Sequence, residues 1–389
     1  MHALLEIVII LVASLLAGAV SSRLNIPAVV GQLLIGIVIG PPILGLVHNG
    51  EILHFLSELG VILLMFMAGL EADFSLLKKY LKPSLLVAIT GVVVPLVVFY
   101  FLTQAMHFKV SQSVFYGLVF AATSISITVE VLQEYDKVST DIGAIIIGAA
   151  VADDIIAVLL LSFFVSSQGS TENISIQLIE QLLFFVFLWL AIKILIPWLV
   201  RRLEVLASKN LMFYVALILC FSLSWLADQV GMSSIIGSFF AGLAIGQTKQ
   251  GHNVMKRVTS FGYSFFIPIF FASIAFPLRF TGLLEHLSMI ISFTILVVLT
   301  KLIPGYLVGR GFKFPKMESI TIGGGMVSRG EMALIIIGVG QAAHIIGNRV
   351  YSELVIITIA STVIAPFILK YSFKGSKGPQ KGLNSTDGY

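Results

Sequence analysis

The stretch GAAVADDIIAVLLL, residues 148–161, places two adjacent carboxylates, Asp153 and Asp154, inside an apolar run that is long enough to cross a lipid bilayer. On scales of helix insertion, one Asp at the centre of a membrane helix costs roughly 2.5 to 3.5 kcal/mol. Two such residues without partners would strongly oppose insertion. We therefore interpret the pair as a functional site, and we expect other polar groups of the chain to lie around it.

The composition indicates a protein that crosses the membrane many times. Of the 389 residues, 58% are hydrophobic and only 11% are charged, whereas soluble domains have about 25% charged residues. The apolar runs are continuous for about 20 residues, as membrane helices require, rather than short and alternating as in an outer-membrane barrel. We therefore predict an all-α polytopic membrane protein.

Thirteen apolar runs, bounded by charge, Pro or Gly, are predicted to be transmembrane helices. With this count, alternate loops hold most of the Lys and Arg residues, and the loops between them hold only Lys109, Arg279 and Arg349. The positive-inside rule then places the amino terminus outside and the carboxyl terminus in the cytoplasm, with a disordered tail over 371–389. The predicted spans are approximately 3–22, 27–46, 52–70, 84–105, 112–134, 141–167, 175–198, 211–229, 232–247, 257–276, 286–308, 319–343 and 351–370.

A weak internal repeat relates the two halves of the chain. Gly31, Gly36 and Gly40 in NIPAVVGQLLIGIVIG (25–40) match the glycines of GMSSIIGSFFAGLAIG (231–246) at one constant offset. The two segments enter the predicted membrane from opposite sides, so the repeat is inverted, as in many secondary transporters with a midplane site. Spans one to six would then match spans eight to thirteen, with span seven as a linker. The alternative is that these glycines only allow helices to pack closely.

Five charged residues fall at membrane depth in this arrangement: Asp153 and Asp154 in span six, Lys301 in span eleven, and Arg329 and Glu331 in span twelve. If all faced lipid they would cost on the order of 15 kcal/mol, so we expect them to face one another or water. Their summed charge of minus one suits a bound monovalent cation or protons. Adjacent helix positions point about 100° apart, so the two carboxylates are expected to have different roles.

Two stretches near the predicted midplane are rich in hydroxyl residues and glycine: ATSISIT (122–128) in span five and GGGMVSRGE (323–331) in span twelve. They occupy equivalent positions in the two halves. We predict that both helices are interrupted there, because freed carbonyls can coordinate an ion and half-helix ends carry dipoles that need compensating charge. Arg329 and Glu331 can supply that charge. The alternative for the Thr and Ser residues is that their hydroxyls bond back to their own helix.

The sequence argues against several other kinds of protein. The formal net charge of +4 is spread through short loops rather than gathered in a patch, so we expect no nucleic-acid partner. The single cysteine, Cys220, excludes an intramolecular disulfide and a cysteine cluster for a metal. An intramembrane aspartyl protease needs two carboxylates about 3 Å apart, usually from separate helices. Asp153 and Asp154 are consecutive residues of one predicted span, which argues against this alternative. A passive cation channel is a third alternative, against which the inverted repeat and the buried Lys301 favour a carrier.

The sequence resembles sodium/proton antiporters of the second cation:proton antiporter family, the NapA-like group. Four motifs carry this resemblance: ATSISIT, GAAVADD, the Lys of VLTKLIPG, and SRGE. The similarity covers nearly the whole chain. It implies a prokaryotic cell-membrane protein whose domain, residues 1–370, has thirteen helices with spans five and twelve unwound and crossed. It also implies a homodimer through a bundle of about 1–46 and 175–247, and an elevator-like movement of an ion-translocating core of about 52–167 and 257–370.

By motif, the resemblance implies that Asp154 is the essential ion-binding carboxylate and that Asp153 is the partner of Lys301. Thr123 and Ser124 would lie in the unwound part of span five. Na+ would be held at Asp154 and Asp153, and Lys301 would release a proton when Asp153 turns to the cation. An Asp pair with this Lys resembles the electrogenic members, so the resemblance implies exchange of cytoplasmic Na+ or Li+ for external protons, without a cofactor.

One residue departs from the family pattern, because Ser328 stands where a small residue or Pro usually precedes the Arg of span twelve. We expect this difference to affect the local backbone around Arg329 and Glu331 only. The same fold could also serve a K+/H+ antiporter or a mixed Na+/H+-K+ antiporter. Potassium-efflux relatives normally carry a large cytoplasmic nucleotide-binding domain, which is not evident in this sequence, so sodium is the favoured ion.

Overall fold

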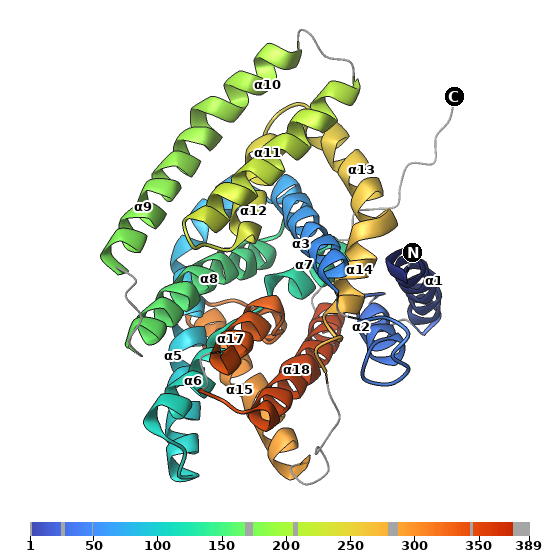
Figure 1. The fold of residues 1–389 in the computed structure, drawn as a ribbon. Coiled ribbons are helices and arrows are strands. Elements are labelled where there is room, and N and C mark those ends of the chain that lie inside the picture. The colour runs from blue at the N-terminus through green and yellow to red at the C-terminus, as the bar shows by residue number, and fades with distance from the viewer. Residues whose placement is uncertain are drawn as a thin grey trace.

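The computed structural model describes residues 2–24, 28–48, 50–167, 174–204, 209–278, 287–342 and 345–375. All regular secondary structure in these residues is helical (Figure 1). The helices pack as two groups, with three further helices at the edges. The all-helical class predicted from the apolar runs is thereby confirmed.

The first group contains helices from the start and the middle of the chain, which pack on one another in Figure 1. Its members are α1 (His2–Arg23), α2 (Ala28–Ile39), α3 (Glu51–Glu71), α11 (Lys209–Gln229), α12 (Ser234–Gly246), α13 (Gly251–Phe261), the π-helical turn η2 (Gly262–Phe266) and α14 (Ile267–Ser273).

The second group contains the residues around the Asp pair and most of the last third of the chain. Its members are α5 (Leu81–Ala105), α6 (Val110–Ala121), α7 (Ile125–Glu134), α8 (Asp141–Ser167), α15 (Leu287–Gly311), α16 (Lys316–Gly325), α17 (Glu331–Ala342) and α18 (Asn348–Gly375). Helix α7 lies at the boundary, because it contacts α8 and α18 of this group and α2 and α3 of the first group.

Three helices lie at the edges of the two groups. Short α4 (Phe74–Lys79) precedes α5, while α9 (Ile174–Leu190) and α10 (Ile196–Glu204) are joined by the π-helical turn η1 (Ala191–Leu195) into one long helical segment at the edge of Figure 1. Large apolar side chains of α9, such as Leu182, and of α1, such as Leu15, are more than half exposed. Such faces suit contact with lipid or with another membrane helix.

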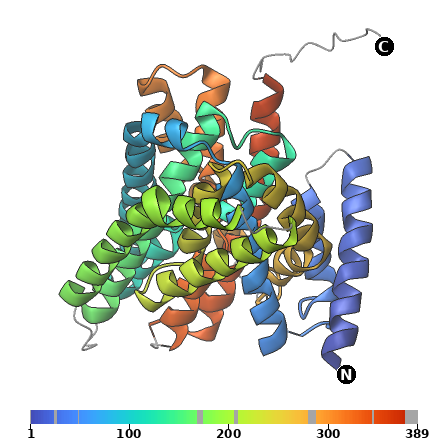
Figure 2. The same cartoon turned by 90° about the horizontal axis from the view of Figure 1, so that it is seen from above.

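The helices have the length and composition of membrane spans. Eight segments of the described chain are long and apolar enough to cross a membrane, and shorter apolar helices occur in α2, α12 and α17. Helix α1 begins at one end of the molecule and α18 ends at the opposite end (Figure 2). These findings define a multi-pass membrane protein, whereas the count of thirteen spans stays a prediction.

Glycines set the closest helix contacts in the first group. A Cβ added at Gly242 of α12 would overlap the carbonyl oxygen of Phe66 in α3, and one added at Gly36 of α2 would overlap the carbonyl oxygen of Ala272 in α14. The other pair of glycines that match in the repeat, Gly31 and Gly237, also makes close contacts: Gly31 packs on α1 and Gly237 packs on α11. Close approach through small residues is the usual means of packing membrane helices. The glycines that match in sequence therefore make corresponding contacts in space.

Two helices of the second group are interrupted, over narrower stretches than predicted. Residues 122–124 separate α6 from α7, and residues 326–330 separate α16 from α17. The prediction extended over 122–128 and 323–331, but Ser126 and Thr128 belong to the first turns of α7, and the three glycines complete α16. The end of α16 stays wound because the Met326 amide bonds to the Gly323 carbonyl, which closes the last helical turn.

Candidate functional site

A buried ion pair lies where three segments of the second group meet. The ammonium Nζ of Lys301 on α15 lies 3.1 Å from Oδ1 of Asp153 on α8, and both side chains are fully buried. The same Nζ donates a hydrogen bond of 2.7 Å to Oγ1 of Thr123, in the interruption before α7. The structure thus brings together three residues that the sequence places on predicted spans five, six and eleven.

A buried pair of this kind gives little net stability, because both groups lose their hydration, but removing one partner leaves an uncompensated charge. The second carboxylate oxygen of Asp153, Oδ2, is buried and has no hydrogen-bond partner among the described residues. The carboxylate therefore keeps an acceptor that a cation or a proton can use. Gly91 of α5 makes room for the pair, since a Cβ added there would lie 3.3 Å from Nζ of Lys301.

Asp154 lies next to this pair and is also buried, with 4% of its surface exposed. It is close enough to Lys301 for the two charges to interact. Two carboxylates and one ammonium thus share one poorly hydrated region, together with the guanidinium of Arg329, which interacts with Asp153. A cation or a proton that binds at one of these groups would therefore affect the charge balance of the others.

The two interruptions bond directly to each other. The amide of Ser124 donates to the carbonyl of Ser328 (2.8 Å), and the hydroxyl of Ser328 donates to the carbonyl of Ser124 (2.6 Å). Nearby, the hydroxyl of Thr128 donates to the carbonyl of Gly325 at the end of α16 (2.7 Å). Gly330 fits here because a Cβ at this position would overlap the Ser124 hydroxyl. Backbone groups that the interruptions free are therefore satisfied across the pair, as buried polar groups require.

Arg329 is fully buried at the carboxyl end of α16. Its guanidinium donates to the carbonyls of Val327 (2.9 Å) and Met326 (3.4 Å), and to that of Val297 on α15 (3.4 Å). A cation at this place offsets the negative end of the helix dipole and satisfies carbonyls that the helix leaves free. The side chain of Glu331, the second residue predicted to compensate charge, lies outside the described part of the structure.

Helix α18 contributes residues that the sequence reasoning did not single out. The hydroxyl of Thr362 accepts from the Arg329 amide (3.2 Å) and donates to the Arg329 carbonyl. One turn earlier, Thr358 is also fully buried. A signal was present in the sequence, because Thr358 and Thr362 are four residues apart and so lie on one face of a predicted span. Thr128 was within a predicted stretch, but its contact with α16 was not foreseen.

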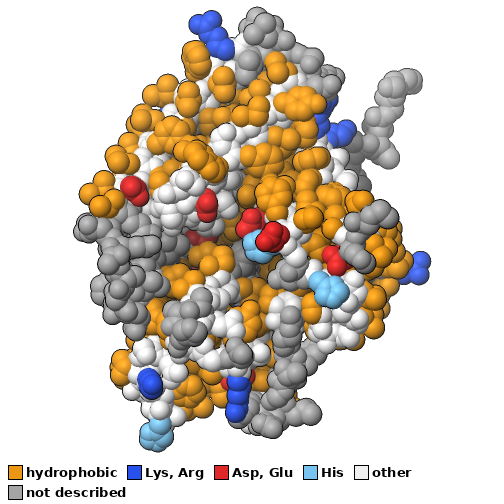
Figure 3. Space-filling view, viewed as in Figure 1, with side chains coloured by type: hydrophobic (Ala, Val, Ile, Leu, Met, Phe, Trp, Pro, Cys, Tyr) orange, Lys and Arg blue, Asp and Glu red, His pale blue; other side chains and the backbone are white. Residues whose placement is uncertain are grey.

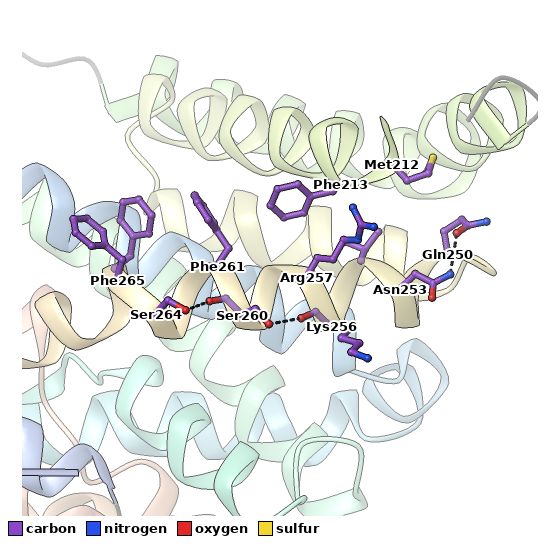
Figure 4. Close-up of a pocket in the computed structure, with 12 residues that line it drawn as sticks. Met212, Phe213, Gln250, Asn253, Lys256, Arg257, Ser260, Phe261, Ser264 and Phe265 are labelled. Atoms are coloured by element: carbon purple, nitrogen blue, oxygen red, sulfur yellow. Dashed lines mark hydrogen bonds between the residues drawn. The ribbon is translucent and has the colours of Figure 1, made fainter. Parts of the chain in front are cut away.

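A wide cavity lies away from these residues, between α11 and α13 (Figure 4). It has a volume of about 920 Å³, and its lining includes Phe213, Lys256, Arg257 and Phe261. In Figure 4, Phe213 extends from α11 toward Arg257 and Phe261 on the facing helix. None of the predicted site residues lines this cavity, so its size does not make it the candidate site.

An all-helical membrane protein with a buried Lys and Asp pair beside two interrupted helices has the features of a secondary ion transporter. The chain belongs to the family described as sodium/hydrogen exchanger, transmembrane, whose model matches residues 8–375. The resemblance to sodium/proton antiporters inferred from the motifs is thereby confirmed.

Relatives in this family are similar over nearly their full lengths. The chain is 44% identical over 370 residues to a Na+/H+ antiporter of Enterococcus hirae, with 94% of this chain and 97% of that protein covered. It is 40% identical over 369 residues to the Na+/H+-K+ antiporter GerN of Bacillus cereus, with 95% of each covered. Among solved structures, the sodium proton antiporter MjNhaP1 of Methanocaldococcus jannaschii matches with a TM-score of 0.70 at 16% identity, covering 96% of each chain. That match shows a shared fold.

Proposed function

We propose that this protein is a secondary active Na+/H+ antiporter that exports Na+ or Li+ from the cytoplasm in exchange for external protons. The observation that carries the proposal is the buried pair of Lys301 and Asp153, with a carboxylate oxygen that lacks a partner among the described residues and with Asp154 beside it. The names of the relatives from Enterococcus hirae and Bacillus cereus agree with this activity. The protein is then a transporter and not an enzyme, and it needs no cofactor.

The exchange would use the two carboxylates in different ways. Asp154 binds the cation and the proton in alternation. Asp153 turns from Lys301 toward the arriving cation, and the ammonium of Lys301, now without a partner in a region of low dielectric, releases a proton. Thr123, which accepts from the same ammonium, and Ser124 offer hydroxyl and carbonyl oxygens to the dehydrated cation.

This mechanism moves two protons for each Na+, one from Lys301 and one from Asp154, so transport is electrogenic. Arg329, held on the carbonyls at the end of α16, would keep the interrupted helix neutral while the ion charge changes. We assign the same compensating role to Glu331. We propose that Ser328 joins the two interruptions.

A second candidate is K+/H+ or mixed Na+/H+-K+ exchange at the same site. It is favoured by the similarity to GerN, whose name includes both cations. The buried oxygens around Asp153 and Asp154 can bind either monovalent cation, and the size of the site when the cation is bound decides between them.

The two groups of helices support a model in which one group moves against the other. We propose thirteen spans, with α6–α7 and α16–α17 as the discontinuous crossing helices, and an inverted repeat whose matched glycines make corresponding contacts. The second group, which carries the charges, would be the moving core. Because α3 and α14 pack on α12 and α2, we place residues 52–70 and 257–276 with the first group, which would form the homodimer.

The localisation we propose is the cell membrane of a prokaryote, with the amino terminus outside and the carboxyl terminus in the cytoplasm. Support comes from the placement of the start of α1 and the end of α18 at opposite ends of the molecule (Figure 2). Na+, protons and membrane lipids are the expected partners.

The activity can be tested with purified protein in vesicles that carry a proton gradient and a pH-sensitive dye. Added Na+ and Li+ should dissipate the gradient, and an imposed membrane potential should change the rate. A gradient unaffected by Na+, Li+ and K+ would contradict antiport, and a rate that ignores the potential would contradict the two-proton stoichiometry.

A further inference from the structure

Buried prolines break the hydrogen bonding of three long helices in the second group. Pro95 lies inside α5, Pro304 inside α15 and Pro366 inside α18, and all three are buried. Because proline has no amide hydrogen, the carbonyl four residues earlier in the helix loses its donor. The carbonyls released in this way belong to Gly91, Thr300 and Thr362.

Each released carbonyl belongs to a residue beside one of the two buried cations of the site. Thr300 directly precedes Lys301 in α15. The Thr362 hydroxyl bonds to the amide and the carbonyl of Arg329. Gly91 of α5 faces Lys301, because a Cβ added there would lie 3.3 Å from Nζ and 3.5 Å from Cδ of that side chain. Three different helices thus bring a released carbonyl to the region of the site.

A released carbonyl inside a membrane protein needs a donor from the protein itself. The face seen in Figure 3 is mainly hydrophobic and has few charged side chains, which suits contact with lipid. In such surroundings, neighbouring helices and side chains must satisfy the carbonyls that prolines release. For Gly91, the nearest donor group across the helix contact is the Lys301 ammonium.

The ammonium of Lys301 can supply that donor. It carries three hydrogens, and among the described residues it has two acceptors, Oγ1 of Thr123 at 2.7 Å and Oδ1 of Asp153 at 3.1 Å. The Lys301 side chain is fully buried, and buried donors normally find partners inside the protein. Since Gly91 has no side chain, its backbone can approach the ammonium closely.

We propose that the Gly91 carbonyl, made available by Pro95, is the third acceptor of the Lys301 ammonium. It holds the ammonium in place when Asp153 turns to the cation. The proposal rests on the antiport function proposed above. An ammonium with no anion beside it in low dielectric gives up its proton, whereas a carbonyl that accepts from it favours the charged form. Gly91 and Pro95 are therefore positioning residues that control the pH at which Lys301 releases its proton.

Other charged groups act on the same ammonium. Asp153 and Asp154 of α8 attract its positive charge, and Arg329 in the interruption after α16 repels it. Helix α5 faces it with Gly91, which has no side chain to titrate. A substitution at Pro95 leaves all of these charges in the chain, so its effect on proton release reports on the carbonyl.

The first test is the pH profile of Na+-dependent exchange in vesicles. Pro95→Ala restores an amide that donates to the Gly91 carbonyl, as in a regular helix, and this amide competes with the ammonium. Lys301 should then release its proton more readily, and exchange should reach half its maximum at a pH about half a unit to one unit lower. That shift is about three- to tenfold in proton concentration, the size expected for one hydrogen bond. An unchanged profile, or a shift to higher pH, would overturn the proposal.

A matched control is Pro83→Ala in the same helix. Pro83 is the third residue of α5, about 12 Å along the helix from Gly91. The carbonyl four residues before it belongs to Lys79, at the end of α4. Pro83→Ala should therefore keep the wild-type pH profile. An equal shift in both variants would mean that a change in the shape of α5, and not the Gly91 carbonyl, affects exchange.

Unfolding in detergent tests the contact without transport, so it distinguishes failure of this proposal from failure of the antiport function. The background is the double variant Asp153→Asn with Lys301→Met, which lacks both charges of the buried pair. There Pro95→Ala should raise the melting temperature, because a helical hydrogen bond forms and no ammonium competes for the carbonyl. In the wild-type background the rise should be smaller or absent, because the ammonium loses an acceptor.

The difference between the two backgrounds measures the coupling between Pro95 and the buried pair. Pro83→Ala should change the melting temperature by the same amount in both backgrounds. If Pro95→Ala also changes it equally in both, the Gly91 carbonyl does not hold the Lys301 ammonium, whether or not the wild-type protein exchanges Na+ for protons.

Discussion

Ser124 and Ser328 are joined by two hydrogen bonds. The amide of Ser124 donates to the carbonyl of Ser328, and the hydroxyl of Ser328 donates to the carbonyl of Ser124. The two residues belong to interruptions in different helices, more than 200 positions apart in the chain. Their mutual bonds join the interruptions into one unit, on which Thr123 and Arg329 are placed. The candidate ion site therefore depends on both halves of the chain.

Asp154→Asn should abolish Na+-dependent proton exchange in vesicles, because the amide cannot bind and release the proton that balances the cation. Asp228→Asn is the matched control, since Asp228 is an exposed carboxylate on α11, and its exchange rate should stay near that of the wild type. Unchanged exchange in Asp154→Asn would show that the ion binds elsewhere.

Lys301→Met should destabilise the protein by about 3 to 5 kcal/mol, the usual cost of leaving one partner of a buried ion pair uncompensated. The double variant Asp153→Asn with Lys301→Met removes both charges and should recover most of that loss. Unfolding of the purified protein in detergent measures the two effects. Equal destabilisation of the single and double variants would mean that Asp153 does not depend on Lys301 for charge balance.

Thr128→Val should lower stability by about 1 to 3 kcal/mol, because the Gly325 carbonyl loses its donor inside the protein. Exchange should also slow, since the interruptions lose one of their connections. The control is Thr90→Val on α5, whose hydroxyl bonds back to the Leu86 carbonyl of its own helix. Unfolding and vesicle assays of the two variants should differ clearly, and similar losses would contradict a special role of Thr128.

Gly242→Ala should destabilise the contact between α3 and α12 by about 1 to 3 kcal/mol, because the added methyl group overlaps the Phe66 carbonyl and forces the helices apart. Gly338→Ala on α17 adds the same group where no atom lies within 4 Å. That variant should unfold at the wild-type temperature or slightly above it. The comparison fails if both substitutions lower the melting temperature equally.

Asp73 is the N-cap of α4 and lies outside the membrane spans; its carboxylate accepts hydrogen bonds from the amides of Ser75 and Leu76. The Ser75 hydroxyl, followed by these amides, holds the pKa of the Asp73 carboxyl below its ordinary value of 3.8. The cap therefore stabilises α4 fully above that value, and the stabilisation is lost as the pH falls through the lowered pKa of the folded state. Asp73→Ala should cost about 1 kcal/mol at neutral pH, and Asp73→Asn much less. Unfolding at pH 7 and in acid measures both.

The sequence predicts the charged part of the site because charge is rare and costly in apolar runs. Asp153 and Lys301 stand out for this reason, and hydroxyl and glycine residues mark both interruptions. The buried Glu130, which accepts a hydrogen bond from Tyr263 of η2, does not stand out, since it lies near the end of a predicted span where a carboxylate usually meets water. Its burial depends on how η2 and Tyr263 pack against α7, and pairwise packing of helices far apart in the chain leaves little trace in composition or periodicity. The grouping of α3 with α12 was unpredicted for the same reason.

Helix α7 has ten residues and is about 15 Å long, which is too short to bend appreciably without losing its hydrogen bonds. It begins directly after Ser124 and ends at Glu134, so it joins the interruption at Thr123 to the contacts that α7 makes with α2 and α3 of the first group. If the second group moves as proposed, these contacts and the residues around Thr123 must therefore shift together.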